Sequence, residues 1–207
     1  MIADLFFGLL QWVSLLFIFS FHNYLKALAV IKLGDDTPQR FGFNTFNPVV
    51  HIDIFGTVIF PLILIFVKAP IIFGWPKPVP IDYHKLRDAR TGALIISAVS
   101  IVSYFLVAFL GLILYKLLLL LNFPSQLEVL IILFKYVFLI SAFFGFLNLI
   151  PIPPLDLGTV LLLLLKRDIE EINRYSLIGS IVIIVLFLSG IINFFFYPIL
   201  NFLLNFL

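Results

Sequence analysis

Apolar residues run along this chain in long blocks separated by short polar or proline-rich segments. About 20 apolar residues are enough for a helix to cross the hydrocarbon core of a membrane. The blocks predict membrane-spanning helices at residues 2–31, 54–73, 94–121, 127–149 and 176–207, with a short further helix at 157–165. This pattern indicates an all-α polytopic membrane protein with about five or six transmembrane helices in a single domain, residues 1–207.

Punctuating residues set the expected ends of these helices. Gly34 is a plausible stop for the first helix, a tight turn is expected at residues 122–125, and Pro198 is the expected bend in the last block. Residues 166–174 are charged and predict a loop. Asp4, with no Lys or Arg beside it, argues against a cleavable signal peptide, so the N-terminus is expected to belong to the first span.

The segment between the first two blocks has a different pattern. Residues 41–48 alternate aromatic side chains with small or polar ones, which is typical of short strands. Irregular backbone at membrane depth requires protein or a cavity to satisfy its hydrogen bonds. We therefore expect a short re-entrant or interfacial strand pair within residues 41–53, whose edge could pair with an extended peptide from a partner.

Composition supports the membrane assignment. The chain is 63% hydrophobic and 12% charged, whereas soluble domains average about 45–50% apolar and about 25% charged residues. Lipid must cover the apolar surface that 207 residues cannot bury.

Lys and Arg gather in residues 68–90 and 166–174, which predicts that both segments face the cytoplasm. A net charge of +2 gives no indication of nucleic-acid binding, and the absence of cysteine excludes disulfides and thiolate ligands.

Three groups of polar residues interrupt the apolar background. His22, Asn23 and Lys26 share one face of the first helix, because residues three and four apart are neighbours. A second group lies in the polar segment and a third flanks a proline-rich break: Asn44, Asn47, His51 and Asp53, then Asn148 and Asp156. Ionisable groups at membrane depth are costly and usually functional.

The order and spacing of these groups resemble the site-2 protease family of intramembrane zinc metalloproteases, in particular its compact bacterial branch. That family carries His-Glu-x-x-His, and residues 22–26 here read His-Asn-Tyr-Leu-Lys, with Gly34-Asp35 at the matching distance. Residues 46–53 are similar to its Leu-Asn-Pro-x-x-His-x-Asp motif. Residues 74–80, Gly-Trp-Pro-Lys-Pro-Val-Pro, and 148–157 match two further family segments.

The resemblance implies a zinc ion held by two histidines and an aspartate, with a glutamate as general base. His22 and Asp156 match the first and third ligands, but Asn23 replaces the base and Lys26 replaces the second histidine. The family's Gly-Pro-x-x-Asn element reads Val-Ser-Ile-Val-Ser at residues 99–103, and Leu157 replaces a glycine. An amide cannot accept a proton near neutral pH, and an ammonium cannot ligate zinc.

These departures predict a catalytically inactive homologue, a pseudoprotease without zinc, that binds or stabilises a membrane protein partner. We expect Lys26 to pair with Asp156 in place of the metal, and Asn47, His51, Asp53 and Asn148 to line the site. The resemblance also implies a role in regulated intramembrane proteolysis. The expected location is therefore the bacterial inner membrane, with lipids and a membrane protein as partners.

Several alternatives stay open. The chain could be an active metalloprotease with a rearranged zinc site, using His51 and Asp53 together with His22 and Asp156. A small transporter or channel subunit is a weaker alternative, because the chain lacks duplicated halves with broken helices. Locally, Lys26 could extend toward the membrane surface, Asn23 could contact a neighbouring helix, and Asp53 could cap the second span.

Overall fold

The computed structural model describes residues 2–69, 72–121 and 128–207, and within these ranges the chain is helical with no strand. The helices are α1 Ile2–Lys32, α2 Thr37–Arg40, α3 Pro48–His51, η1 Ile54–Ile59, α4 Phe60–Phe66, α5 Ala89–Leu120, α6 Glu128–Leu147, α7 Asp156–Leu164, α8 Ile169–Leu188 and α9 Ile191–Leu204. The turn expected at 122–125 lies outside the described residues.

Three long helices form the centre of the molecule. Helices α1, α5 and α6 pack against one another, and their shared core includes Phe19, Tyr104 and Phe144. Among the described residues, three helices are long and apolar enough to cross a membrane, namely Ala3–Lys32, Ala89–Leu120 and Glu128–Leu147. Three of the predicted spans are thus present. Helix α5 begins earlier than expected because the Asp88 carboxylate accepts hydrogen bonds from the Arg90 and Thr91 amides.

The expected number of about five or six spans is not supported, because two apolar blocks are divided. The block at 54–73 gives η1 and α4, which end at Phe66 and together are too short to count as a span. Beyond them Lys68 lies in the left-handed region at φ 57°, and residues 72–80 have no regular secondary structure. The block at 176–207 divides at Gly190, φ 74°, while Pro198 lies inside α9, so the bend is not where it was predicted. Helix α8 also begins at Ile169, within the predicted charged loop.

The strand pair expected within residues 41–53 is wrong. Gly42 turns the chain at φ 76°, and the Asn47 side chain accepts the Val49 amide to start α3 at Pro48. This capping geometry with proline at the first helical position favours a helical turn over a strand. The expected stop at Gly34 is confirmed, since α1 ends at Lys32 and Gly34 adopts φ 112°.

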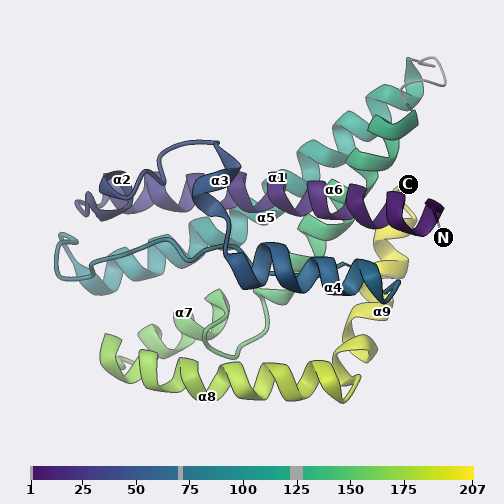
Figure 1. Ribbon diagram of the computed structural model, residues 1–207. Coiled ribbons are helices and arrows are strands. Elements are labelled where there is room, and N and C mark those ends of the chain that lie inside the picture. The colour runs from purple at the N-terminus through teal and green to yellow at the C-terminus, as the bar shows by residue number, and fades with distance from the viewer. Residues whose placement is uncertain (1, 70–71, 122–127) are drawn as a thin grey trace.

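The remaining helices surround this centre. Helix α7 packs on α5, whereas η1, α4 and the short helices α2 and α3 lie near α1 (Figure 1). Helix α8 contacts α7 and α9, and α9 leads back toward α6 (Figure 1). The polar groups of α1, α5 and α7 therefore meet inside the helical assembly.

Candidate functional site

The polar face of α1 meets two serines of α5. His22 is 5% exposed, and its Nδ1 lies 2.7 Å from the Ser103 hydroxyl. Ser103 donates its own proton to the Ser100 carbonyl at 2.7 Å, so its oxygen accepts the proton of His22 Nδ1. The imidazole also stacks on Tyr104, with ring centroids 4.0 Å apart. His22 is thus fixed by α5 on one edge and one face.

Asp156 begins α7 and lies opposite Lys26. Its Oδ2 accepts a hydrogen bond from Ser100 at 2.6 Å, and its Oδ1 lies 3.8 Å from the Lys26 Nζ. Both side chains are largely shielded, with 22% of Lys26 and 11% of Asp156 exposed. The ion pair expected from the sequence is therefore present. It joins the C-terminal half of α1 to the first turn of α7.

Asn148 positions Asp156. Its side-chain carbonyl lies 3.4 Å from the Asp156 amide, and its backbone carbonyl accepts the Leu157 amide at 3.0 Å. Ser100 and Ser103, by contrast, were identified in the sequence only as departures from the family pattern. Two serines three residues apart lie on one face of a helix, and this spacing is the sequence feature that could have identified them as site residues.

Asn23, which the family resemblance aligns with the general base, is 2% exposed and makes a structural contact. Its side-chain amide donates to the Lys77 carbonyl at 2.8 Å, across 54 residues of sequence. The contact is therefore with the segment after α4 and not with a neighbouring helix. Asp35, of the Gly34-Asp35 pair, is also buried, and its carboxylate accepts the Thr37 and Asp82 amides.

The polar segment contributes little to this cluster. Asn47 caps α3, and Asp53 caps η1 by accepting the Gly56 amide at 2.6 Å, as one alternative expected. Asn44 is exposed. His51 is 1% exposed; its Nε2 donates to the Thr45 carbonyl at 2.8 Å, while its Nδ1 has no hydrogen-bond partner among the described residues.

The residues present do not fit a zinc ion. Within the described ranges, no three His, Cys, Asp or Glu side chains are grouped so that they could hold a metal, so His22, His51, Asp53 and Asp156 do not form such a set. His22 Nδ1 and Asp156 Oδ2 are engaged by serines, and the Lys26 ammonium lies beside Asp156. A positive charge beside the carboxylate opposes cation binding at this position.

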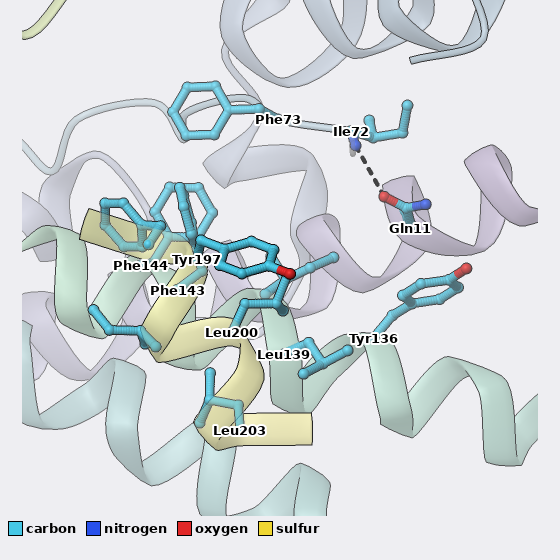
Figure 2. Close-up of a pocket in the computed structure, with 13 residues that line it drawn as sticks. Gln11, Ile72, Phe73, Tyr136, Leu139, Phe143, Phe144, Tyr197, Leu200 and Leu203 are labelled. Carbon is cyan, nitrogen blue, oxygen red and sulfur yellow. Dashed lines mark hydrogen bonds between the residues drawn. The ribbon is translucent and has the colours of Figure 1, made fainter. Parts of the chain in front are cut away.

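An apolar pocket lies behind the polar cluster. It has a volume of about 360 Å³ and is lined by residues of α1, α6, α9 and the segment after α4, which include Gln11, Phe73, Phe143 and Tyr197 (Figure 2). Gln11 is its buried polar residue and accepts the Ile72 amide at 2.9 Å. Tyr197 is 67% exposed, so the pocket reaches the molecular surface there.

A column of nearly parallel rings connects the pocket with the cluster. Phe73 and Phe144, both at the pocket wall, stack at 5.5 Å and 17°, and Phe144 stacks on Tyr104 at 5.5 Å and 18°. Tyr104 in turn stacks on His22 at 16°. A single row of aromatic rings therefore links the pocket with the His22 imidazole.

His51 predicts a pH dependence of stability. Burial lowers the pKa of His51 below its ordinary value, against the opposing effect of the Thr45 carbonyl. A folded-state pKa below the unfolded one gives stability that is complete above about pH 6.5 and is lost as the pH falls. Unfolding in detergent should show this loss, and His51→Gln should reduce it. Replacing the exposed His84 by Gln should leave it unchanged; equal pH profiles for wild type and His51→Gln would contradict the assignment.

Comparison with known proteins agrees with the sequence resemblance. A protein of Bacillus subtilis (strain 168), described as "Putative zinc metalloprotease YwhC", is 30% identical over 196 residues, which cover 91% of this chain and 84% of the relative. No family model and no solved structure match the chain. The relative's name is consistent with a site-2 protease-like family, and the long apolar helices indicate an integral membrane protein. By this identity over most of its length, the chain belongs to the membrane metalloprotease family of YwhC.

Proposed function

We propose that this protein is a catalytically inactive member of its family, a pseudoprotease that binds or stabilises a partner protein in the bacterial inner membrane. The observation that carries the proposal is the Lys26 ammonium, which faces Asp156 at 3.8 Å where a second imidazole is expected. A zinc site needs neutral or anionic donors. The Lys26 ammonium is itself a cation, so it would repel a zinc ion.

The contact of Asn23 supports the same conclusion. A general base must accept a proton from water. The Asn23 side chain instead donates to the Lys77 carbonyl. Both replaced residues therefore make contacts that fit their new chemistry, which is expected when a site keeps its structure and loses its reaction.

Partner binding is supported by the pocket beside the cluster. Its lining is almost wholly apolar and includes several aromatic side chains. Its opening at Tyr197 and Leu200, which is 36% exposed, suits an apolar side chain of a transmembrane helix. A photo-crosslinker at position 200 should therefore capture a partner in native membranes that one at Phe109, 60% exposed on α5, does not.

A strand edge within residues 41–53 is not part of this proposal. The His51 and Gly56 carbonyls next to it already accept the Lys77 and Trp75 amides. Release of this internal pairing would be needed before a partner peptide could use those carbonyls.

Zinc content tests the loss of the metal. Asn23→Glu combined with Lys26→His restores the family motif, and this double variant should purify with about one zinc ion per chain, because two imidazoles and a carboxylate then converge. Wild type should contain far less. Lys85→His, at an exposed loop position, is the matched control and should resemble wild type.

The same assay distinguishes the alternative of an active protease with a rearranged site. Stoichiometric zinc in wild type, together with cleavage of a membrane substrate that is lost in His22→Ala, would establish that alternative. No contact in the described structure favours it over the inactive homologue.

A further inference from the structure

Helix α5 begins where α7 ends and α8 begins, at one end of the molecule (Figure 1). A pocket of about 480 Å³ lies there, lined by the segment before α5, the first turn of α5 and the connection between α7 and α8. We call it the charged pocket, because its lining includes His84, Arg90, Lys166, Arg167, Asp168 and Glu170. None of the described residues that contact the Asp156 side chain lines it, so the charged pocket is separate from the candidate functional site.

The charged pocket adjoins both a membrane-spanning helix and exposed apolar side chains. Helix α5 is long and apolar enough to cross a membrane, and its first turn contributes Arg90. Leu164 and Leu165, which directly precede Lys166, are 59% and 70% exposed. Charged side chains that follow lipid-facing apolar ones at a helix end are expected at the level where acyl chains meet headgroups.

Arg90 is anchored at the wall of the charged pocket. Its Nη2 donates to the Leu163 and Leu164 carbonyls at the end of α7. A guanidinium has five N–H donors, so these two bonds leave donors for a further acceptor. Phosphate oxygens are among the acceptors that the planar guanidinium matches best.

The other charges of the pocket do not neutralise one another by direct contact. Lys166, Asp168 and Glu170 form no ion pair among the described residues. Arg167 pairs with Glu171, which is not part of the lining. Lys166 also adopts φ 61°, a left-handed conformation in which glycine would be less costly. The pocket therefore presents positive and negative groups that are both open to a ligand.

A ligand that complements this pocket carries both signs of charge. An isolated phosphate would be repelled by the Asp168 and Glu170 carboxylates as well as attracted by the cations. A phosphate joined to a primary ammonium avoids this conflict, because its ammonium donates hydrogen bonds to a carboxylate. A trimethylammonium group has the same charge but no N–H to donate.

We propose that the charged pocket binds the headgroup of a phosphatidylethanolamine molecule from the surrounding bilayer. Arg90 and Lys166 donate to its phosphate. Asp168 and Glu170 accept from its ammonium, and its acyl chains lie against the exposed leucines at the end of α7. The bound lipid thus links the start of α8 to α5. This site does not depend on the proposed partner binding or on the loss of zinc.

Native mass spectrometry of the full chain in detergent micelles tests the headgroup. Phosphatidylethanolamine, phosphatidylglycerol and phosphatidylcholine with identical acyl chains are supplied in equal amounts. The fraction of protein that retains phosphatidylethanolamine should exceed the fraction with either other lipid about fivefold, as expected for one additional hydrogen bond to a charged group. Equal retention of phosphatidylethanolamine and phosphatidylcholine, or stronger retention of phosphatidylglycerol, would overturn the proposal.

Charge substitutions at exposed positions locate the headgroup. Lys166→Gln should weaken retention of phosphatidylethanolamine and phosphatidylglycerol about fivefold each, because both carry a phosphate. Asp168→Asn combined with Glu170→Gln should weaken retention of phosphatidylethanolamine but strengthen that of phosphatidylglycerol. Lys32→Gln, at the exposed end of α1, is the matched control and should change neither. Equal effects of Lys166→Gln and Lys32→Gln would show that the lipid binds elsewhere.

Glycerophosphoethanolamine, which has the same headgroup without acyl chains, distinguishes a membrane lipid from a soluble ligand. At a concentration equal to that of the lipid it should displace little phosphatidylethanolamine, because it cannot contact the exposed leucines beside the pocket. Complete displacement would show that the charged pocket takes a soluble phosphate ester and not a lipid.

Discussion

Replacement of Lys26 by methionine is expected to lower the free energy of unfolding by about 3 kcal/mol, because it leaves Asp156 without its counter-ion in a shielded site. Breaking a buried ion pair by removal of one partner costs about 3–5 kcal/mol. The expected value lies at the lower end because Lys26 keeps 22% exposure and its Nζ lies 3.8 Å from Asp156 Oδ1. Ser100 continues to hydrogen-bond the carboxylate and limits the loss. Unfolding in mixed detergent micelles measures the effect.

A double-mutant cycle gives the control. Asp156→Asn should also destabilise the protein, and Lys26→Met combined with Asp156→Asn should recover much of the loss, because no buried charge remains unpaired. Lys85→Met removes an exposed cation near Asp36 and Asp82 and should cost at most about 1 kcal/mol. If the two single losses at 26 and 156 simply add in the double variant, the pair does not link α1 to α7.

Phe144→Ala should lower the free energy of unfolding by about 3–5 kcal/mol, the usual cost of removing a buried aromatic ring. Phe144 is 5% exposed and stacks on both Phe73 and Tyr104 at 5.5 Å. Phe19 contacts its ring edge-on at 5.3 Å. The truncated side chain would leave a cavity between α1, α5 and α6 that these rings cannot close without losing their own contacts.

Phe109→Ala is the matched control for this prediction. Phe109 is on α5 and 60% exposed, so its truncation should change the free energy of unfolding by no more than about 0.5 kcal/mol. A loss at Phe144 no greater than that at Phe109 would indicate that the aromatic column does not stabilise the core. A change in the ring environment of His22, detected by NMR, should accompany the loss at Phe144 but not at Phe109.

The buried polar residues of α1 follow a common pattern. Lys26 pairs with Asp156, and Asn23 binds a backbone carbonyl. Ser100 and Ser103 satisfy Asp156 and His22. Each buried polar group of the cluster thus has a partner that does not depend on a metal. This satisfaction explains how polar residues can persist in an apolar interior, where an unpaired group is costly.

Much of the fold could be predicted from the sequence because long apolar runs respond to the lipid environment directly. The three helices α1, α5 and α6 could be predicted from the length and hydropathy of their own segments, without knowing what packs against them. The block at 54–73 misled because, apart from Thr57 and Lys68, its composition is apolar, while its helix ends at Phe66 and Lys68 takes a left-handed backbone. Hydropathy reports the average polarity of a segment and does not show where within it a helix ends.

The expected strand pair failed for a related reason. Alternation of aromatic and polar residues at 41–48 fitted a strand, but Gly42, Asn47 and Pro48 favour turns and a helix start, and these local signals prevailed. Likewise Gly190 and not Pro198 divides α8 from α9, because a left-handed backbone is least costly at glycine.

By itself, the sequence determined that this is an apolar, helical membrane protein with several motifs that resemble those of a protease family, and with Asn23 and Lys26 among its departures from them. Residue chemistry was sufficient for that, since an amide cannot act as a base and an ammonium cannot bind zinc. The pairing of Lys26 with Asp156 was expected from the family resemblance, whereas only the tertiary structure decided that Asn23 contacts the Lys77 carbonyl. Asn23 and Lys77 are 54 residues apart, so their contact depends on the path of the segment after α4. Contacts across such separations follow from packing of the whole chain and are not encoded in any local pattern.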